Sequence, residues 1–265
     1  MLRRMLLVVI GMMMFVLPVH AQDGMTYVLV HGAFQDAAGW DPVIAELEAA
    51  GHTAIAVQLP GRGDDTTPMG EQSLAAYRDA VITVIEEQDT PVVLVAHSFG
   101  GMVISEVAEA IPDQIATLVY VAAYLPQNGD SLVTLSENDH FSQLGQEGNF
   151  IVSADFTTAS VNRDIFASAF CPDCDAAQAE AVAASQLDEP LPPLGTPVTL
   201  TDENFGSVRR VYILTAQDIV VSAQLQAFML SNTPVDRVFA LNTGHVPYVT
   251  APAALAALLV QAVAE

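Results

Sequence analysis

The sequence predicts an α/β fold in which a mostly parallel β-sheet is flanked by helices. Apolar runs of strand length alternate with helical patterns along most of the chain, which is typical of such sheets. The chain has 265 residues, 52% of them hydrophobic, which is enough to bury a large core. We therefore expect residues 22–265 to form one α/β domain.

The expected elements follow one another in a regular order. Residues 25–31 are expected to form the first strand, and residues 40–50 an amphipathic helix that ends at Gly51, a common helix stop. Further apolar runs predict strands at residues 53–58, 91–96, 118–124, 208–214 and 236–241. Helices are expected between them, at residues 74–87, 99–110, 222–230 and 252–263.

The alternation breaks in the middle of the chain. Residues 125–206 are rich in Asp, Ser, Thr, Pro and Gln, and they hold two helical patches, at residues 161–170 and 176–186. This pattern predicts a helical cap, inserted into the α/β domain, and we call residues 125–206 the cap.

A serine lies at the junction between an expected strand and the helix that follows it. The apolar run at residues 93–96 is followed by His97, Ser98 and Phe99, and a helical pattern begins at once. Ala96 and Gly100 flank Ser98 at the positions where a sharp strand-to-helix turn leaves room only for small residues. The usual pattern has Gly at both positions, so Ala96 is a mild departure. Ser98 is thus the expected nucleophile.

A nucleophilic serine needs a histidine to take its proton and a carboxylate to orient that histidine. In folds with this strand-to-helix turn the chain order is Ser, then Asp or Glu, then His. Asp218 follows a late expected strand, and His245 follows the last one, next to Gly244. Asp218 could instead cap the next helix, so Asp236 is kept as a second candidate acid, although it precedes its strand.

The same chemistry needs two backbone N–H groups aimed at the developing negative charge. One is expected from Phe99, directly after the nucleophile. The other is expected from Ala33 in the loop after the first strand, where Gly32 allows close approach of the backbone.

The N-terminal residues resemble a secretory signal peptide. Arg3 and Arg4 precede an apolar run, and residues 19–21 resemble a cleavage site. The apolar run is shorter than a membrane span, which disfavours the alternative of an anchor. We therefore expect residues 1–21 to be removed and the mature protein to be exported and free of the membrane.

The charge of the chain is strongly negative. Loss of Arg3 and Arg4 with the signal peptide would take the formal net charge from −23 to −25. Such a surface repels nucleic acid, so nucleic acid is excluded as a partner. Cys171 and Cys174 form a Cys-x-x-Cys pair; in an exported protein a local disulfide is one expectation, and a redox or zinc site is disfavoured by the surrounding sequence.

Over residues 25–264 the chain resembles the α/β-hydrolase superfamily. The motifs that carry the resemblance are residues 29–34, 58–63 and 96–101, together with Asp218, Gly244 and His245. Their spacing and residues 120–126 resemble a branch that holds plant methylesterases, hydroxynitrile lyases and bacterial esterases such as pyrethroid-type carboxylesterases. Gln58 departs from this pattern, because many relatives have Asp there, and we expect its role to be structural.

The resemblance implies a Ser–His–Asp hydrolase that uses Ser98, His245 and Asp218, with Ala33 and Phe99 as oxyanion donors. Hydroxynitrile lyases of this branch use a lysine near the catalytic histidine, and this chain has no lysine, so lyase activity is disfavoured. A non-catalytic small-molecule binding protein is the other alternative.

We thus expect an esterase that cleaves a small to medium hydrophobic ester through an acyl-enzyme, without metal or cofactor. The sequence makes no prediction about oligomeric state. Apolar cap side chains, with Tyr124, Leu125 and Met102, are candidates for the substrate pocket; those in the cap are Phe141, Leu144, Phe150, Phe156, Phe166 and Phe170.

Overall fold

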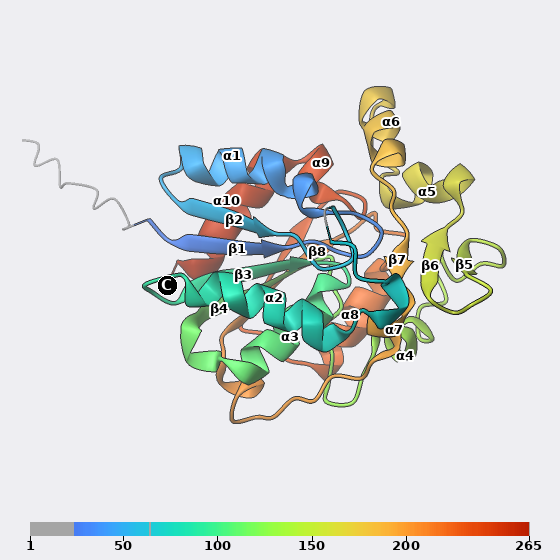
Figure 1. Cartoon of the computed structure of the whole chain (residues 1–265). Helices are drawn as coiled ribbons and strands as arrows, with labels where there is room; N and C mark the ends of the chain where they lie inside the picture. The colour runs from blue at the N-terminus through green and yellow to red at the C-terminus, as the bar shows by residue number, and fades with distance from the viewer. Residues whose placement is uncertain (1–23, 64, 265) are drawn as a thin grey trace, which may run out of the picture.

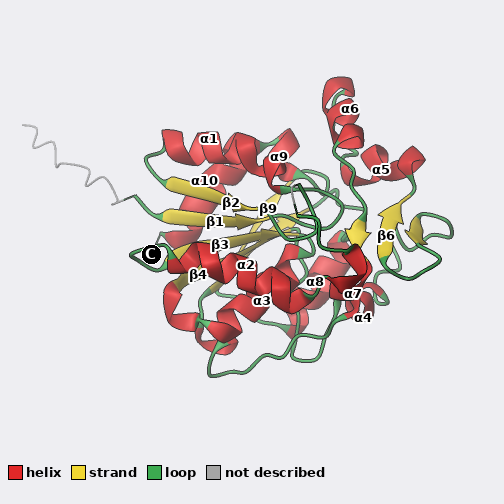
Figure 2. Ribbon diagram, in the orientation of Figure 1, coloured by secondary structure: helices red, strands yellow, loops and turns green. Residues whose placement is uncertain are grey.

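Six parallel strands form the central sheet of the computed structural model, which describes residues 24–63 and 65–264 (Figures 1 and 2). The order across the sheet is β2–β1–β3–β4–β8–β9, and every neighbouring pair is parallel. The strands are β1 (Thr26–Val30), β2 (Thr53–Val57), β3 (Val92–His97), β4 (Ile115–Val121), β8 (Arg210–Thr215) and β9 (Arg237–Leu241). The expected fold class is therefore confirmed. The expected signal peptide, residues 1–21, lies outside the described residues.

Helices cover both faces of this sheet. On one face α1 (Asp41–Ala49) packs beside α10 (Pro252–Val263), and on the other α2 (Leu74–Glu86) packs beside α3 (Gly100–Ala110) (Figure 1). Further helical segments are α8 (Ala223–Asn232), α9 (Pro247–Thr250), η1 (Ala37–Trp40), η2 (Met69–Glu71), η3 (Pro112–Gln114) and η4 (Phe205–Ser207). All six residues of β3 are buried, as expected for a central parallel strand that is covered on both faces.

Several expected element boundaries differ from the observed ones, and two of the differences have a clear local cause. Strand β4 starts at Ile115 and ends at Val121, whereas residues 118–124 were expected, because Ala122 has a φ of 46° and turns the chain out of the sheet. The first helical patch of the cap was expected from residue 161. Its helix begins only at Arg163, after Asn162 has capped it by accepting a hydrogen bond from the Asp164 N–H.

The cap lies between β4 and β8 and covers one end of the sheet (Figure 1). It contains the helices α4 (Leu132–Ser136), α5 (Arg163–Phe170), α6 (Ala176–Ala184) and α7 (Leu191–Gly195). It also contains a small antiparallel sheet that the sequence pattern did not indicate, formed by β5 (Phe150–Val152), β6 (Thr158–Val161) and β7 (Glu189–Pro190).

The last residues of the cap return along the main domain. The Thr199 and Thr201 N–H groups each donate a hydrogen bond of 2.7 Å to a glutamate of α3, Glu106 and Glu109 respectively. These bonds anchor the end of the cap segment before β8 begins.

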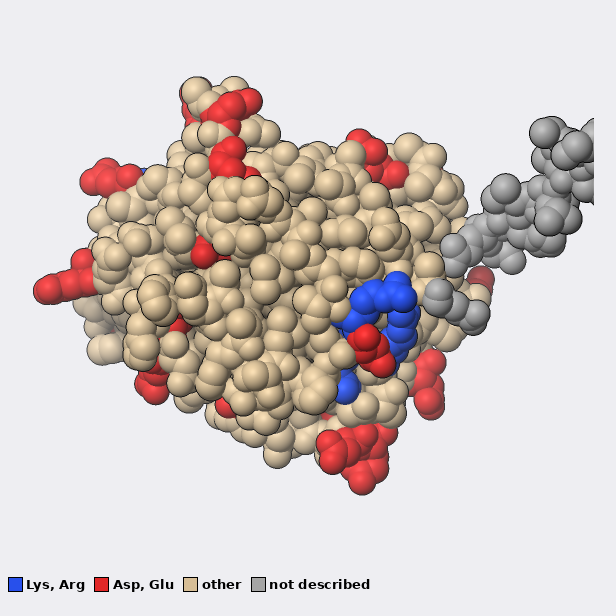
Figure 3. Space-filling view, turned by 180° about the vertical axis from the view of Figure 1, so that it is seen from behind, with Lys and Arg blue, Asp and Glu red and all other residues tan. Residues whose placement is uncertain are grey.

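Few charged groups lie on the face opposite to that of Figure 1. In Figure 3 the arginine side chains gather mainly in one place, and the acidic side chains are scattered, mostly toward the margin. Since the chain has no lysine, arginine supplies all of its permanent positive side-chain charge. Among the described residues, no helix is long and apolar enough to cross a membrane.

The register of the sheet brings the two loops of the expected site together. Val30, at the end of β1, is paired with Ala96, near the end of β3. The loop after β1 and the turn after β3 therefore leave the carboxyl ends of two neighbouring strands side by side, beneath the cap.

Candidate active site

Ser98 occupies a strained turn between β3 and α3. Its φ of 53° lies in the left-handed region, which non-glycine residues rarely adopt. Hydrogen bonds hold this conformation: the Ser98 N–H donates to the Val121 carbonyl at 3.3 Å, and the Ser98 carbonyl accepts from the Tyr124 N–H at 3.0 Å. The turn thus places Ser98 directly beyond the carboxyl end of β3, as the sequence pattern predicted.

Gly32 lets the loop after β1 approach this turn closely. A β-carbon at position 32 would lie 2.7 Å from the Ser98 β-carbon and 2.9 Å from Nδ1 of His97, distances that real side chains do not adopt. Only glycine allows the loop to pass here.

His245 lies between Ser98 and Asp218 and is fully buried. Its Nε2 is 3.0 Å from the Ser98 Oγ, and its Nδ1 is 2.8 Å from Oδ2 of Asp218. This geometry allows Nδ1–H to donate to the carboxylate and Nε2 to accept a hydrogen bond from the Ser98 hydroxyl. The structure brings the three expected residues together in the expected order of contact.

The Asp218 carboxylate is held by several donors besides His245. Oδ1 accepts hydrogen bonds from the N–H groups of Val220 and Val221, at 2.8 and 3.1 Å. Oδ2 accepts from the Thr215 hydroxyl at 3.1 Å and from the Gln226 amide at 3.3 Å. These contacts fix the carboxylate in a buried position, and nothing in the local sequence around Gln226 indicated its part.

Asp236, the second candidate acid, is not at the site. It precedes β9, and its Oδ2 accepts a hydrogen bond from the Arg210 N–H at 2.9 Å. The site lies at the carboxyl ends of the strands. A residue in front of β9 lies at their amino ends, on the opposite side of the sheet from the site.

The backbone N–H groups of Ala33 and Phe99 lie near Ser98. Neither the Ala33 nor the Phe99 N–H donates a hydrogen bond to another backbone or side-chain group in the described parts of the chain. Ala33 and Ser98 line the same cavity, and Phe99 is the next residue after the turn. This is the arrangement that oxyanion donors require.

Two further buried histidines, His31 and His97, support the site, and no sequence pattern indicated a role for them. His97 Nε2–H donates to the His245 carbonyl at 2.7 Å, and burial lowers the pKa of His97 well below its usual range. His31 Nδ1–H donates to the Gly32 carbonyl at 2.8 Å, and its Nε2 accepts from the Leu59 N–H at 3.2 Å. Burial, and then the nearby Arg62 charge, lower the His31 pKa to about 3. Both rings are therefore neutral and act as fixed hydrogen-bonding groups.

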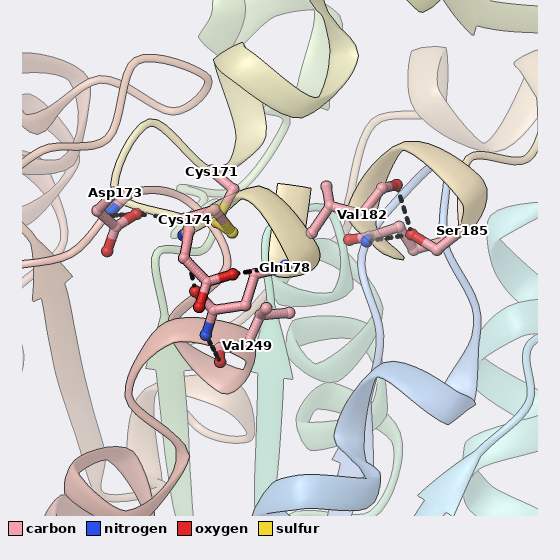
Figure 4. The surroundings of a disulfide bond; sticks show 10 residues. Cys171, Asp173, Cys174, Gln178, Val182, Ser185 and Val249 are labelled. Carbon is pink, nitrogen blue, oxygen red and sulfur yellow. Dashed lines mark hydrogen bonds between the residues drawn. A yellow bond between two sulfur atoms is a disulfide. The ribbon is translucent and has the colours of Figure 1, made fainter. Parts of the chain in front are cut away.

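Cys171 and Cys174 form a disulfide in the turn between α5 and α6 (Figure 4). Within this turn, Asp173 Oδ1 accepts a hydrogen bond of 3.0 Å from the Gly244 N–H, directly before His245. Farther along, the Gln178 amide donates to the Val249 carbonyl at 3.1 Å. The disulfide turn thus supports the loop that carries the histidine.

A cavity of about 320 Å³ lies above Ser98, between the main domain and the cap. Most of its wall is apolar, and the cap contributes Leu132, Val133, Leu144, Phe150, Phe170 and Leu194. Of the other expected pocket residues, Phe166 stacks behind Phe170 at 4.1 Å between ring centroids, and Phe141 and Phe156 are 61% and 73% exposed. Met102 and Leu125 are buried and do not line the cavity.

Tyr124 gives the cavity wall a polar group. The residue is only 6% exposed, and its hydroxyl has no hydrogen-bond partner among the described residues. Burial, with smaller contributions from Asp139 and Asp218, raises the Tyr124 pKa above its usual range, so the hydroxyl keeps its proton. Because Tyr124 lines the cavity, we expect this hydroxyl to be a donor for a molecule that binds there.

The family model described as "Alpha/beta hydrolase family" matches residues 27–258. The chain belongs to this family. The hydrolase is 29% identical over 251 residues to methylesterase 7 of Arabidopsis thaliana, covering 89% of this chain and 95% of that protein.

Solved structures agree with this assignment. An extracellular alpha/beta-hydrolase from a Paenibacillus species, described as sharing structural and functional homology with tobacco salicylic acid binding protein 2, is 26% identical. Its TM-score is 0.77, with 90% of this chain and 98% of that chain covered. A pyrethroid hydrolase structure, 23% identical with a TM-score of 0.75, covers 90% of this hydrolase and 96% of its own chain and supports the fold alone.

Proposed function

We propose that this hydrolase cleaves small to medium, hydrophobic carboxylic esters through an acyl-enzyme intermediate on Ser98. The observation that carries the proposal is the buried chain of contacts from Asp218 through His245 to Ser98, at 2.8 and 3.0 Å, which ends in a largely apolar cavity. The names of related proteins, methylesterase 7 among them, support ester hydrolysis as the reaction.

The first half of the proposed reaction forms the acyl-enzyme. His245 Nε2 takes the Ser98 proton while Oγ bonds to the ester carbonyl carbon, and the carbonyl oxygen becomes an oxyanion. The Ala33 and Phe99 N–H groups would then donate to this oxygen, at roughly 3–4 kcal/mol of transition-state stabilisation per donor. When the carbon–oxygen bond to the alcohol breaks, the imidazolium returns its proton to the leaving alkoxide.

The second half releases the acid. His245 takes a proton from water, and the resulting hydroxide bonds to the acyl carbon. The bond to Ser98 Oγ breaks, and the serine regains its proton from His245. Throughout, Asp218 holds the imidazole in the correct tautomer and stabilises its positive charge.

The chemistry of the cavity supports the substrate class. Its apolar wall and moderate size fit a hydrophobic ester, and a negatively charged protein disfavours polyanionic substrates. The chain has no lysine to take the part that a lysine plays in hydroxynitrile lyases, so cleavage of cyanohydrins is disfavoured.

The test is hydrolysis of p-nitrophenyl esters of graded acyl length. We expect Ser98→Ala to lower kcat roughly 10⁴- to 10⁶-fold, as loss of the nucleophile does in related chemistry. The matched control is Ser207→Ala, because Ser207 is an exposed serine in η4, and it should keep full activity. Equal turnover by wild type and Ser98→Ala would contradict the proposal.

We also propose that residues 1–21 are a signal peptide and that the mature hydrolase is exported. The Cys171–Cys174 disulfide supports this, since disulfides persist mainly in oxidising compartments. So does the similarity to the Paenibacillus hydrolase, which is described as extracellular. N-terminal sequencing of protein from an expressing cell's exterior or periplasm should begin at Gln22; an uncleaved N-terminus retained in the cytoplasm would contradict export.

A further inference from the structure

A buried carboxylate of the cap lies directly behind the loop that carries Ala33. Glu189, in β7, is fully buried, and its Oε2 accepts a hydrogen bond of 2.9 Å from the Phe34 N–H. The same oxygen pairs with the Arg62 guanidinium, which is also buried. The other oxygen accepts from the Tyr77 hydroxyl at 3.2 Å. One cap side chain therefore joins three separate parts of the main domain.

The cap and Arg62 make further hydrogen bonds to the loop that carries Ala33. The Leu187 N–H donates to the Phe34 carbonyl at 2.8 Å, so both backbone polar groups of Phe34 are bound by cap residues. Arg62 Nε donates to the Gln35 carbonyl at 2.9 Å. The Gln35 amide donates to the Ser185 hydroxyl at 3.0 Å.

The conformation of Phe34 needs such support. Its φ is 66°, in the left-handed region, which is strained for an L-residue that is not glycine. The hydrogen bond to Glu189 fixes the plane of the Ala33–Phe34 peptide and directs the Phe34 N–H to a residue that does not line the cavity. The Ala33 N–H, one residue earlier, donates to no other group in the described parts of the chain, and Ala33 lines the cavity with Ser98.

We propose that Glu189 is a positioning residue for ester hydrolysis, which holds the Ala33 N–H in place for the oxyanion from within the cap. This inference rests on the proposed function. Glu189 acts through the loop, because Ala33 and Phe34 line the cavity and Glu189 does not. Through this contact, the position of the cap and the strength of the oxyanion hole are linked.

The test is Glu189→Gln, measured with p-nitrophenyl butyrate and with a trifluoromethyl ketone inhibitor. The ketone forms a tetrahedral adduct whose oxygen occupies the oxyanion hole. Loss of one oxyanion donor costs about 10²- to 10³-fold in kcat, and a displaced donor less, so we expect kcat to fall roughly 10- to 100-fold with little change in KM. The inhibition constant of the ketone should rise by the same factor as kcat/KM falls.

The matched control is Gln186→Ala. Gln186 is buried in the cap near Glu189, but its amide donates to the Val161 carbonyl, inside the cap. The Gln186→Ala substitution should lower the melting temperature and leave kcat and the inhibition constant of the ketone unchanged. Should Glu189→Gln fail to fold, the double variant Arg62→Met with Glu189→Gln removes the unpaired buried charge. Because it also removes the bond from Arg62 to the Gln35 carbonyl, we expect its kcat to fall at least as far, and unchanged kcat in the double variant would overturn the proposal.

The outcomes separate the two proposals. An active wild type with unchanged kcat and inhibition constant in Glu189→Gln would overturn the role of Glu189 and leave the proposed function intact. An equal loss in Gln186→Ala would also overturn it, because general loosening of the cap would then explain the effect. A wild type that hydrolyses no ester would instead contradict the proposed function.

Discussion

Asp218, the proposed acid of the site, is held by His245 and by donors that lie within eight residues of it in the sequence. The position after a late strand was enough to select it, and the structure confirms its contact with His245 at 2.8 Å. The competing expectation, that Asp218 caps the next helix, is wrong, because Ser222 caps α8 by accepting a hydrogen bond from the Leu225 N–H at 3.1 Å. Oδ1 of Asp218 instead accepts the Val220 and Val221 N–H groups in the turn ahead of that cap.

Replacement of this acid should damage the chemistry and leave substrate binding intact. For Asp218→Asn we expect kcat to fall by about 10⁴-fold with little change in KM, because the amide favours the wrong tautomer of His245. The control is Asp236→Asn, because Asp236 lies at the amino ends of the strands, away from the site. This variant should keep wild-type kcat. Steady-state kinetics on one p-nitrophenyl ester decides, and equal kcat values for the two variants would refute the role of Asp218.

Tyr124 should determine which esters bind well. We expect Tyr124→Phe to raise KM about 2- to 10-fold for an ester with an acceptor oxygen in its acyl part, the value of one hydrogen bond. An isosteric ester with a methylene in place of that oxygen should show no change, because the hydroxyl has no partner to lose among the described residues. If KM changes equally for both esters, the hydroxyl does not contact the substrate.

At the scale of elements, the main domain was predictable, whereas in the cap only the helices α5 and α6 were indicated by the sequence. Each strand–helix unit carries its own pattern, so β3, Ser98 and α3 could be identified from a few neighbouring residues. The cap strands β5 and β6 have three and four residues, too few to show an alternating pattern. The contact between Arg62 and Glu189 joins residues far apart in the sequence, which no local pattern indicates.

The disulfide turn is an element whose removal should loosen the histidine loop. For the double variant Cys171→Ser with Cys174→Ser, we expect the free energy of unfolding to fall by about 2 kcal/mol, the loop-entropy value for so short a loop. Urea unfolding measures this. Asp173→Ala removes the hydrogen bond to the Gly244 N–H, so it should lower kcat. Its effect on the free energy of unfolding should be smaller than that of the double variant. Unchanged stability of the double variant would show that the turn is held by other contacts.

For the whole molecule, two buried neutral histidines link stability to pH. The folded-state pKa of His31 is lowered to about 3 and that of His97 lies well below its usual range, mainly through burial. In the unfolded chain both titrate near 6.5. Their contribution to the free energy of unfolding is therefore fully present above about pH 6.5 and is lost as the pH falls below it, at up to about 1.4 kcal/mol per pH unit for each histidine.

Unfolding in urea between about pH 5 and 8 measures this dependence. We expect a plateau at the upper end and a decline below about pH 6.5 in the wild type. His140→Gln, a change at an exposed histidine, should leave the curve unaltered. A free energy of unfolding that stays constant down to about pH 5 would show that the buried rings accept protons in the folded state.

The central claim, that Ser98 is the nucleophile of an ester hydrolase, is tested most directly with a fluorophosphonate. The probe is incubated with the folded chain, residual esterase activity is followed, and the labelled peptide is identified by mass spectrometry. We predict that one adduct per chain forms on Ser98 and that activity is lost in proportion to labelling. Activity that persists in fully labelled protein, or an adduct on a residue other than Ser98, would contradict the account.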